Sequence, residues 1–390
     1  MSLRNRILVL FVSTPVLVFV IVGGFLSRVS AGQDSYQPLR VFEDVVQLIL
    51  AGYVEQVDID RAMEGALRGL SDGLDPDSAY LTPEMTRDVE RGTESPAGDI
   101  GLTLTRQYYL RVIAARDASP ALRAGLRSGD YIRAIDGTAT RDMSVFEGNR
   151  RLRGEPGTRV SLVIIRGNAA DPHAVEIVRE AASAPAISGR MLRPGLGYVR
   201  VPALGSGAPG ALKARIEALT RAGAERVIVD LRGTAEGDLD TGLDGARLFV
   251  GSGTLAIRAS RDAGEQRIEA APGDGTVTVP VTILTSHGTA GAAELFAAAL
   301  AGNGRADVVG ERTAGRAGLQ KLVRLPEARG LWLTWARYLT PDGDLLHTRG
   351  LRPDEEVAEP DVEFGEPAPA TDPILDAAIA RAERTRKAAA

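Results

Sequence analysis

The stretch VPVTILTSHGTAGAAELFAAAL, residues 279–300, decides the fold class of this chain. Its first six residues, Val279 to Leu284, are mostly apolar and rich in β-branched side chains, which is typical of a buried strand. A short turn that contains glycine follows, and Gly291 to Leu300 is dominated by alanine, the strongest helix former. A buried strand that turns directly into a helix is the repeating unit of an α/β sheet.

The same alternation of strand and helix surrounds this stretch. It predicts strands at 197–201 and 227–231 and helices at 210–222 and 241–250. Such an alternation favours a sheet with parallel strands, whose ligand sites lie beyond the strand ends, so we expect residues 185–360 to form an α/β core. Residues 361–390 are rich in proline at their start, and we expect a flexible, solvated tail with a short helix at 374–386.

Residues 95–180 have a different sequence pattern. Apolar and polar residues alternate in short segments, which predicts strands at 101–105, 110–114 and 160–164. Four short motifs lie between these strands in a fixed order: Ser119-Pro120-Ala121, Ala124-Gly125-Leu126, Gly129-Asp130-Tyr131-Ile132 and Ile135-Asp136-Gly137. This order resembles a PDZ domain of the circularly permuted bacterial kind. We therefore expect a β-rich domain here.

The resemblance to a PDZ domain implies that an extended peptide binds by adding as a strand to a sheet edge. Backbone N–H groups of the loop Gly98-Asp99-Ile100-Gly101 would receive the terminal carboxylate of that peptide. Leu102, Leu104 and the helix at 144–152 would set the side-chain preference. Because Gly148 weakens that helix, a PDZ-shaped spacer without a ligand is the alternative.

Residues 38–94 are predicted to form a small helical domain that serves as a packing module. Apolar residues at helical spacing predict helices at 41–54 and 59–70. Asp75-Pro76-Asp77-Ser78 is typical of a turn, and Thr82-Pro83 is typical of a helix start.

The first 31 residues contain a segment that could enter a membrane. Ile7 to Leu26 carries no charge and follows Arg4 and Arg6, and a helix of 20 residues spans about 30 Å, the thickness of a bilayer core. Val29-Ser30-Ala31 offers a cleavage site, but the apolar run is longer than the ~7–15 residues of a cleaved signal. We expect an uncleaved single-pass anchor in the cell membrane, with the bulk of the chain exported to the periplasmic side.

Composition excludes several classes of protein and site. With 44% hydrophobic and 25% charged residues, the 390-residue chain has the composition of a globular protein. Its net charge of −5 excludes a basic footprint for nucleic acid over the chain as a whole. The chain has no cysteine and three histidines, so thiolate chemistry is excluded and we expect neither a metal site nor a cofactor.

Further motifs, spread over residues 40–360, occur in an order that matches a family of serine proteases. They are LDPDSAYLTP at 74–83, Asp230-Leu231-Arg232, VGERT at 309–313, ARYLTPDG at 336–343 and GLRPD at 350–354. The chain is similar to the C-terminal processing peptidases, also called tail-specific proteases, which carry a PDZ domain and use a Ser–Lys pair. The resemblance implies proteolysis of protein C-termini.

The catalytic pair that the resemblance implies is replaced in this chain. Gly291 stands at the position of the nucleophilic serine, and Arg316 stands 25 residues later, at the position of the lysine. Gly291 has no oxygen for attack on a carbonyl, and Arg316 stays protonated and accepts no proton. Gln320, which would orient the lysine, is kept.

The loop that the resemblance assigns to oxyanion binding, residues 230–237, departs from the family as well. Glu236 stands in place of a glycine, next to Gly237. A carboxylate near a developing oxyanion opposes catalysis. We expect Arg316 to form an ion pair with Glu236 or Glu311 across the former cleft.

Another residue could serve as the nucleophile. Thr289 lies two positions before Gly291 and close to His287, but the two side chains share a face only if the strand persists that far. A structural role is the favoured interpretation of His287. His173 and His347 are predicted to be surface residues in loops.

Three functions follow from these observations. The favoured one is an exported, membrane-anchored pseudoprotease that binds unfolded or extended protein C-termini through its PDZ domain, as an adaptor or regulator of active relatives. The alternative is a working serine-type endopeptidase that uses a shifted nucleophile such as Thr289. The third is a structural assembly subunit without either activity.

Overall fold

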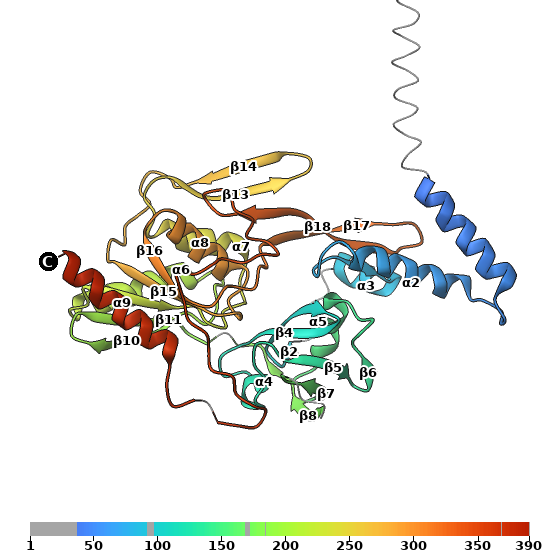
Figure 1. The fold of residues 1–390 in the computed structure, drawn as a ribbon, viewed down its shortest axis with the longest axis horizontal. Coiled ribbons are helices and arrows are strands. Elements are labelled where there is room, and N and C mark those ends of the chain that lie inside the picture. Colours follow the sequence, from blue (N-terminus) through green and yellow to red (C-terminus); the bar gives the residue numbers. More distant parts are fainter. Residues whose placement is uncertain (1–36, 92–96, 168–171, 184, 368, 390) are drawn as a thin grey trace, which may run out of the picture. The chain divides into compact units, whose positions relative to one another are not determined.

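The computed structural model describes residues 37–91, 97–167, 172–183, 185–367 and 369–389 (Figure 1). The predicted membrane segment at 7–26 lies outside these residues. Among the helices that are described, none has the length and apolar character needed to span a membrane. The chain divides between Leu67 and Arg68 into two compact units.

The first unit is helical in its described part. Residues 37–52 form a helix, and helix α2 (Ile59–Asp72) begins after a short link. The Asp58 carboxylate accepts a hydrogen bond from the Arg61 backbone N–H at 3.1 Å and so caps the start of α2. Several large apolar side chains of this unit are exposed: Leu39, Val41, Phe42, Val45, Leu48, Ile49, Leu50, Tyr53, Val54 and Ile59.

The second unit contains an antiparallel domain, which is the β-rich PDZ domain predicted from the sequence. Its main sheet has the strand order β3 (Leu102–Gln107), β4 (Tyr109–Ala115), β5 (Tyr131–Ile135), β7 (Arg159–Ile165) and β8 (His173–Val178). Smaller elements complete it: β2 (Gly98–Asp99) paired with β9 (Glu180–Ala181), β6 (Thr138–Ala139), α4 (Pro120–Arg123) and α5 (Val145–Leu152). Strand β3 lies at the edge of the main sheet, where a further strand could add.

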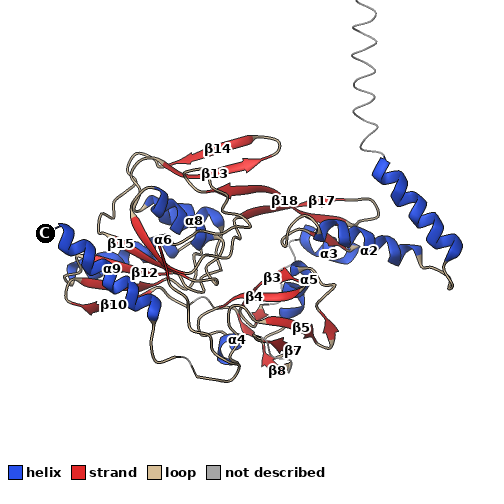
Figure 2. Cartoon of the chain, viewed as in Figure 1, coloured by secondary structure: helices blue, strands red, loops and turns tan. Residues whose placement is uncertain are grey.

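The second domain of the same unit is the α/β core (Figure 2). Its sheet has the order β10 (Ser188–Arg193), β11 (Leu196–Arg200), β12 (Arg226–Asp230), β15 (Val281–Thr285), β16 (Ala306–Gly310) and β19 (Glu355–Glu356). All pairs from β11 onward are parallel, as the alternation of strands and helices predicts. Three connecting helices follow the strands: α6 (Ala208–Arg221), α7 (Leu239–Arg247) and α8 (Ala292–Gly302).

Alternate residues of the core strands pack on opposite faces of this sheet. Val227 and Val229 join the cluster formed with α6, α7 and α8, whereas Ile228 belongs to a second cluster with Ile374 and Ala378. The second cluster is formed by helix α9 (Pro373–Ala389), which lies across β12, β15 and β16. The expectation of a solvated tail is therefore wrong for this helix, because its apolar side chains cover a sheet face that would otherwise be exposed.

An antiparallel sheet connects the N-terminal segment of this unit to the core. Its path runs β1 (Ala79–Leu81), β18 (Gly330–Leu339), β13 (Thr254–Ser260) and β14 (Gly264–Glu269), and β17 (Gly318–Arg324) pairs with β18. Helix α3 (Pro83–Glu90) follows β1, and Thr82 caps it by accepting a hydrogen bond from the Met85 N–H. Residues 79–81 thus belong to a core sheet rather than to a separate helical module.

Candidate functional site

Gly291 lies at the turn between strand β15 and helix α8. Its φ of 61° and ψ of −120° are a conformation that glycine adopts readily and other residues adopt only under strain. A β-carbon at this position would meet only the Arg316 carbonyl oxygen, at 3.8 Å. The turn therefore has the sharp strand-to-helix shape that presents a nucleophile, and it has space for a side chain, but it carries no reactive atom.

Glu294 connects this turn to the loop that carries Arg316. Its carboxylate is fully buried and accepts hydrogen bonds from the backbone N–H groups of Gly291 (2.9 Å), Gly315 (2.6 Å) and Arg316 (2.6 Å). The Thr313 hydroxyl donates a fourth hydrogen bond, at 2.5 Å. Burial raises the pKa of the Glu294 carboxyl, and the four donors oppose that shift. Gly291 and Arg316, which the resemblance places at the positions of the family's serine and lysine, are thus held together by one side chain.

Arg316 pairs with two groups from distant segments. Its Nη1 donates to the Leu104 carbonyl oxygen of β3 at 2.6 Å, and its Nη2 forms an ion pair with the buried carboxylate of Asp77. The expectation that Arg316 faces Glu236 or Glu311 is wrong, because the loop before β1 brings Asp77 to the guanidinium instead. The guanidinium is a fixed cation, so it offers no lone pair to a reacting hydroxyl.

Gln320 takes part in a polar network between β17 and β18. It is paired in register with Thr334, and its Nε2 donates to the Thr334 hydroxyl at 3.2 Å. That hydroxyl in turn donates to the Asp75 carboxylate at 3.2 Å. Gln320 therefore orients a threonine and, through it, an aspartate.

The loop after β12 places Glu236 against the PDZ domain. The Glu236 carboxylate accepts a hydrogen bond from Arg116 at 2.8 Å, and Arg116 also pairs with Asp99 at 2.6 Å. Gly237 has a φ of 132°, and a β-carbon there would lie 2.1 Å from the Leu204 carbonyl oxygen, so glycine is required. Arg116 offsets the negative charge that Glu236 brings to this loop.

The alternative nucleophile, Thr289, has its hydroxyl fully engaged. The residue is 0% exposed, and its Oγ1 donates to the Leu231 carbonyl at 2.8 Å and accepts from the Ser286 N–H at 3.0 Å. The His287 side chain is 61% exposed, with its Nε2 4.0 Å from the Glu311 carboxylate. The structure therefore gives Thr289 a role in shaping the turn and does not bring it together with a base at His287.

The PDZ loop and strand predicted to bind peptide lie close to this turn. Ile100 and Leu104 are buried in the PDZ core, whereas Leu102 is half-buried. Gly98 and Asp99 form β2, and Gly101 has a positive φ of 76°. On the neighbouring strand, Ile113 and Ala114 pack against Ala290, the residue before Gly291.

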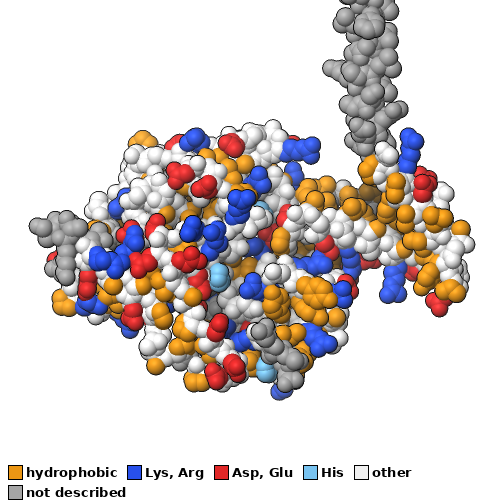
Figure 3. Space-filling model, in the orientation of Figure 1, with side chains coloured by type: hydrophobic (Ala, Val, Ile, Leu, Met, Phe, Trp, Pro, Cys, Tyr) orange, Lys and Arg blue, Asp and Glu red, His pale blue; other side chains and the backbone are white. Residues whose placement is uncertain are grey.

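Over the face drawn in Figure 3, basic and acidic side chains are intermixed rather than gathered by sign. Several arginines among the described residues form ion pairs with carboxylates, as Arg166 does with Asp130 at 2.6 Å. The absence of a nucleic-acid partner stays a prediction.

The predictions for two histidines are each wrong in one respect, since His173 does not lie in a loop and His347 lies in a loop but not at the surface. His173 lies in β8 and stacks on Phe364, with ring centroids 4.6 Å apart. His347 is only 5% exposed, because its ring is packed over Gly318, and burial lowers the pKa of its imidazole while Asp77 and Asp75 oppose that shift.

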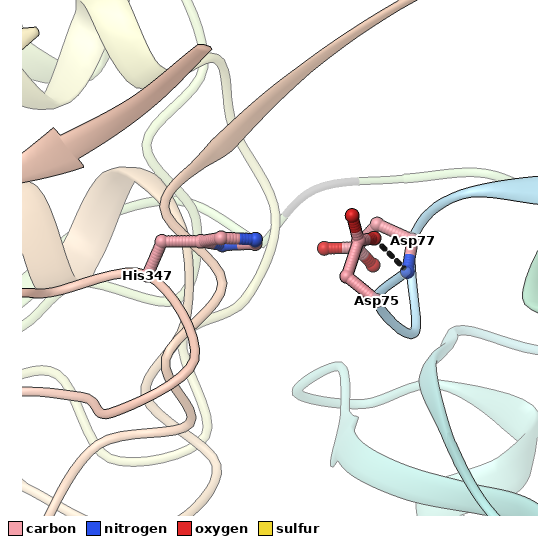
Figure 4. A group of neighbouring side chains, drawn as sticks. All are labelled: Asp75, Asp77 and His347. Atoms are coloured by element: carbon pink, nitrogen blue, oxygen red, sulfur yellow. Dashed lines mark hydrogen bonds between the residues drawn. The ribbon is translucent and has the colours of Figure 1, made fainter. Parts of the chain in front are cut away.

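Figure 4 shows the His347 ring directed at Asp75 and Asp77. One donor atom from each of the three residues lies within 4.8 Å of the others. Sequence reasoning missed this cluster because Asp75 and Asp77 had an adequate explanation as turn residues. Two features of the sequence could have indicated it. Asp75 and Asp77 form an acidic pair in one turn, and His347 lies between the motifs at 336–343 and 350–354.

Comparison with known proteins supports the peptidase-like α/β core and the PDZ domain. The profile of Peptidase family S41 matches residues 195–357, and that of the PDZ domain matches residues 111–166. The carboxyl-terminal-processing protease of Synechocystis sp. is 32% identical over 312 residues, which cover 78% of this chain and 73% of the relative. The carboxy-terminal-processing protease of Bartonella bacilliformis is 29% identical over 359 residues, covering 88% and 82% of the two chains. The solved structure of a photosystem II D1 C-terminal processing protease is similar with a TM-score of 0.68 and 28% identity, covering 81% of this chain and 86% of that one. On these grounds the chain belongs to the carboxyl-terminal-processing protease family of serine peptidases.

Proposed function

We propose that this chain is a proteolytically inactive member of its family that binds extended protein C-termini through its PDZ domain. The observation that carries the proposal is Gly291, which stands at the strand-to-helix turn without a side-chain oxygen. Loss of the nucleophile in a serine protease lowers turnover by about 10⁶, leaving only the contributions of binding and oxyanion stabilisation.

Arg316 supports the same conclusion independently. A general base for a serine must be neutral to accept the proton, and the guanidinium of an arginine stays protonated. Here the guanidinium also lies between Asp77 and the Leu104 carbonyl, so each of its two terminal nitrogens already has a partner. A hydroxyl restored at position 291 alone would still lack a base.

Strand β3 supports peptide binding. It is the edge strand of the PDZ sheet, and an extended peptide adds to such an edge through main-chain hydrogen bonds. The ligand would be the unfolded or extended C-terminus of another protein, and the chain would act as an adaptor or regulator for active relatives. In this arrangement Arg316 competes with the peptide for the Leu104 carbonyl.

The proposal includes an exported location. The uncharged run at 7–26, preceded by Arg4 and Arg6, supports a single-pass anchor in the cell membrane with the rest of the chain on the periplasmic side. An anchored chain would resist carbonate extraction and would be digested by a protease added outside intact spheroplasts. A soluble periplasmic chain beginning at Gly32 would instead identify a cleaved signal.

A peptidase assay on an unfolded, tailed substrate tests the loss of activity. The wild type should not cleave above background, and a serine-directed fluorophosphonate should not label it. Gly291→Ser alone should remain inactive, whereas Gly291→Ser with Arg316→Lys restores both chemical groups and should recover a trace. As a control for added hydroxyls, Gly304→Ser places a serine in the turn after α8 and should not react.

Cleavage by the wild type would contradict the proposal. If Thr289→Ala then abolished that cleavage, Thr289 would be the nucleophile and the chain would be a working endopeptidase. The hydrogen bond from the Thr289 hydroxyl to the Leu231 carbonyl favours the proposal of an inactive chain over that of a working endopeptidase.

A further inference from the structure

The geometry points to a divalent transition-metal site formed by Asp75, Asp77 and His347, with Zn²⁺ as the cation that suits these donors best. The site uses the loop between α2 and β1 and the loop after β18. It does not depend on peptide binding or on the loss of proteolysis.

His347 provides the first argument. Both ring nitrogens are buried, and within the part of the chain that the structure describes neither has a hydrogen-bond partner. Buried polar atoms without a partner are uncommon and cost about 1–3 kcal/mol each. The ring is directed at two carboxylates rather than at apolar side chains (Figure 4), so a cation between them would give the imidazole a partner.

The distances between donors fit a single ion. One donor atom from each residue lies within 4.8 Å of the other two. Zn²⁺ is bound at about 2.0–2.2 Å by imidazole nitrogen and carboxylate oxygen, so donors on one ion lie roughly 3–4 Å apart. The upper bound of 4.8 Å on the donor separations is compatible with that spacing. Three protein donors leave a fourth position for water.

The chemistry of the donors selects the class of metal. Imidazole suits Zn²⁺ and other late divalent ions, whereas a set of oxygen donors alone would suit Mg²⁺ or Ca²⁺. Two carboxylates balance the charge of one divalent cation once Arg316, which pairs with Asp77, is displaced. The Asp75 carboxylate is oriented by the backbone N–H groups of Asp77 and Ser78, both at 2.8 Å, which is the outer support that metal ligands need.

A route for the ion exists at Asp75. This residue lines a cavity of about 430 Å³, together with Arg106 and Tyr108 among others. The cavity therefore gives an ion access to the Asp75 carboxylate. Arg316 is the competitor at this site, because its guanidinium forms an ion pair with Asp77.

Metal titration of the purified full-length chain tests the proposal. The chain is stripped with a chelator, dialysed, and titrated with Zn²⁺ in a calorimeter, with Mg²⁺ in a parallel run. We expect a single Zn²⁺ per chain and much weaker binding of Mg²⁺. His347→Gln should lower the Zn²⁺ affinity at least tenfold, and His287→Gln, which changes an exposed histidine, should leave it unchanged.

Two further measurements keep the test decisive if His347→Gln does not fold. The chain has only three histidines, so ¹⁵N-histidine spectra of a chain carrying His173→Gln and His287→Gln report His347 alone. Its ring signals should shift on addition of Zn²⁺. Arg316→Gln removes the competing cation and should tighten binding by roughly tenfold.

Several results would overturn the proposal. They are a wild type that takes up no Zn²⁺, histidine signals at His347 that do not respond to the metal, and an affinity that is unchanged in His347→Gln. An affinity unaffected by Arg316→Gln would show that Asp77 is not a ligand.

Discussion

At the scale of single residues, Glu294 holds together the two turns that carry Gly291 and Arg316. Its carboxylate joins the Gly291 N–H to the N–H groups of Gly315 and Arg316, so the two turns stay in place whatever side chains stand at 291 and 316. A buried carboxylate with four donors is stable only while all of them remain.

Glu294→Ala should therefore lower the free energy of unfolding by about 3 kcal/mol or more, because it leaves several buried donors without an acceptor. Urea unfolding followed by circular dichroism would measure the difference. Glu265→Ala, which removes an exposed glutamate of β14, should change the stability by less than about 0.5 kcal/mol. Equal stability of the two variants would contradict this role of Glu294.

The sequence predicts part of this site and not the rest. The sequence is enough to place Gly291 and Arg316 at the two catalytic positions of the family, because recognisable motifs lie on both sides of each residue. The partners of Arg316 are not local, since Leu104 lies 212 residues earlier in the chain. Ion pairs of a long side chain depend on which loops the fold brings together, and charge alone does not distinguish Asp77 from Glu236 or Glu311.

At the scale of secondary-structure elements, periodicity predicted three strands of the core (β11, β12 and β15), three of its helices (α6, α7 and α8) and the existence of the C-terminal helix. It did not predict that α9 packs on the sheet. The reason is visible in Ile228, Leu284 and Val309, which face away from α6, α7 and α8 and need a cover. A strand buried on both faces has no alternation, so its sequence does not tell which later segment covers the second face.

The edge strand β3 carries a prediction about peptide binding. In Arg316→Gln the guanidinium no longer occupies the Leu104 carbonyl, so a peptide with an apolar free C-terminus should bind roughly tenfold more tightly than to the wild type. Fluorescence anisotropy with a labelled peptide measures this affinity.

Two controls belong to that measurement. Arg324→Gln removes another arginine, from the exposed end of β17, and should leave peptide affinity unchanged. Amidation of the peptide C-terminus should weaken binding to every variant, because it removes the charge-assisted hydrogen bonds to the loop at 98–101. Equal affinities of Arg316→Gln and the wild type would show that the peptide does not use the β3 edge at Leu104.

At the scale of the whole second unit, Arg200 and Arg116 join the PDZ domain to the core, in addition to the contact of Arg316 with the Leu104 carbonyl. Arg200 of β11 donates to both carboxylate oxygens of Asp117, at 2.9 and 2.7 Å, and Arg116 donates to Glu236 at 2.8 Å. Such paired, partly buried contacts are stronger than exposed ion pairs. They lie beside the packing of Ile113 on Ala290, so the PDZ domain rests directly against the turn of Gly291.

Removing these contacts should free the PDZ domain to move. In Asp117→Asn with Glu236→Gln, Arg200 and Arg116 lose their charged partners across the interface, and partly buried guanidinium groups without them disfavour the closed arrangement. Because the chain has no cysteine, spin labels at Arg133→Cys in β5 and Ala214→Cys in α6 report the separation of the two parts without interference. Pulsed electron–electron double resonance should give a narrow distance distribution in the otherwise wild-type chain and a broad one in the double charge variant.

A control variant removes the same charge elsewhere. Asp262→Asn with Glu265→Gln changes two exposed residues of the β13–β14 hairpin and should keep the distance distribution narrow. A distribution that stays narrow in both variants would mean that the remaining contacts, the packing at Ala290 and the hydrogen bond from Arg316 to Leu104, hold the PDZ domain in place.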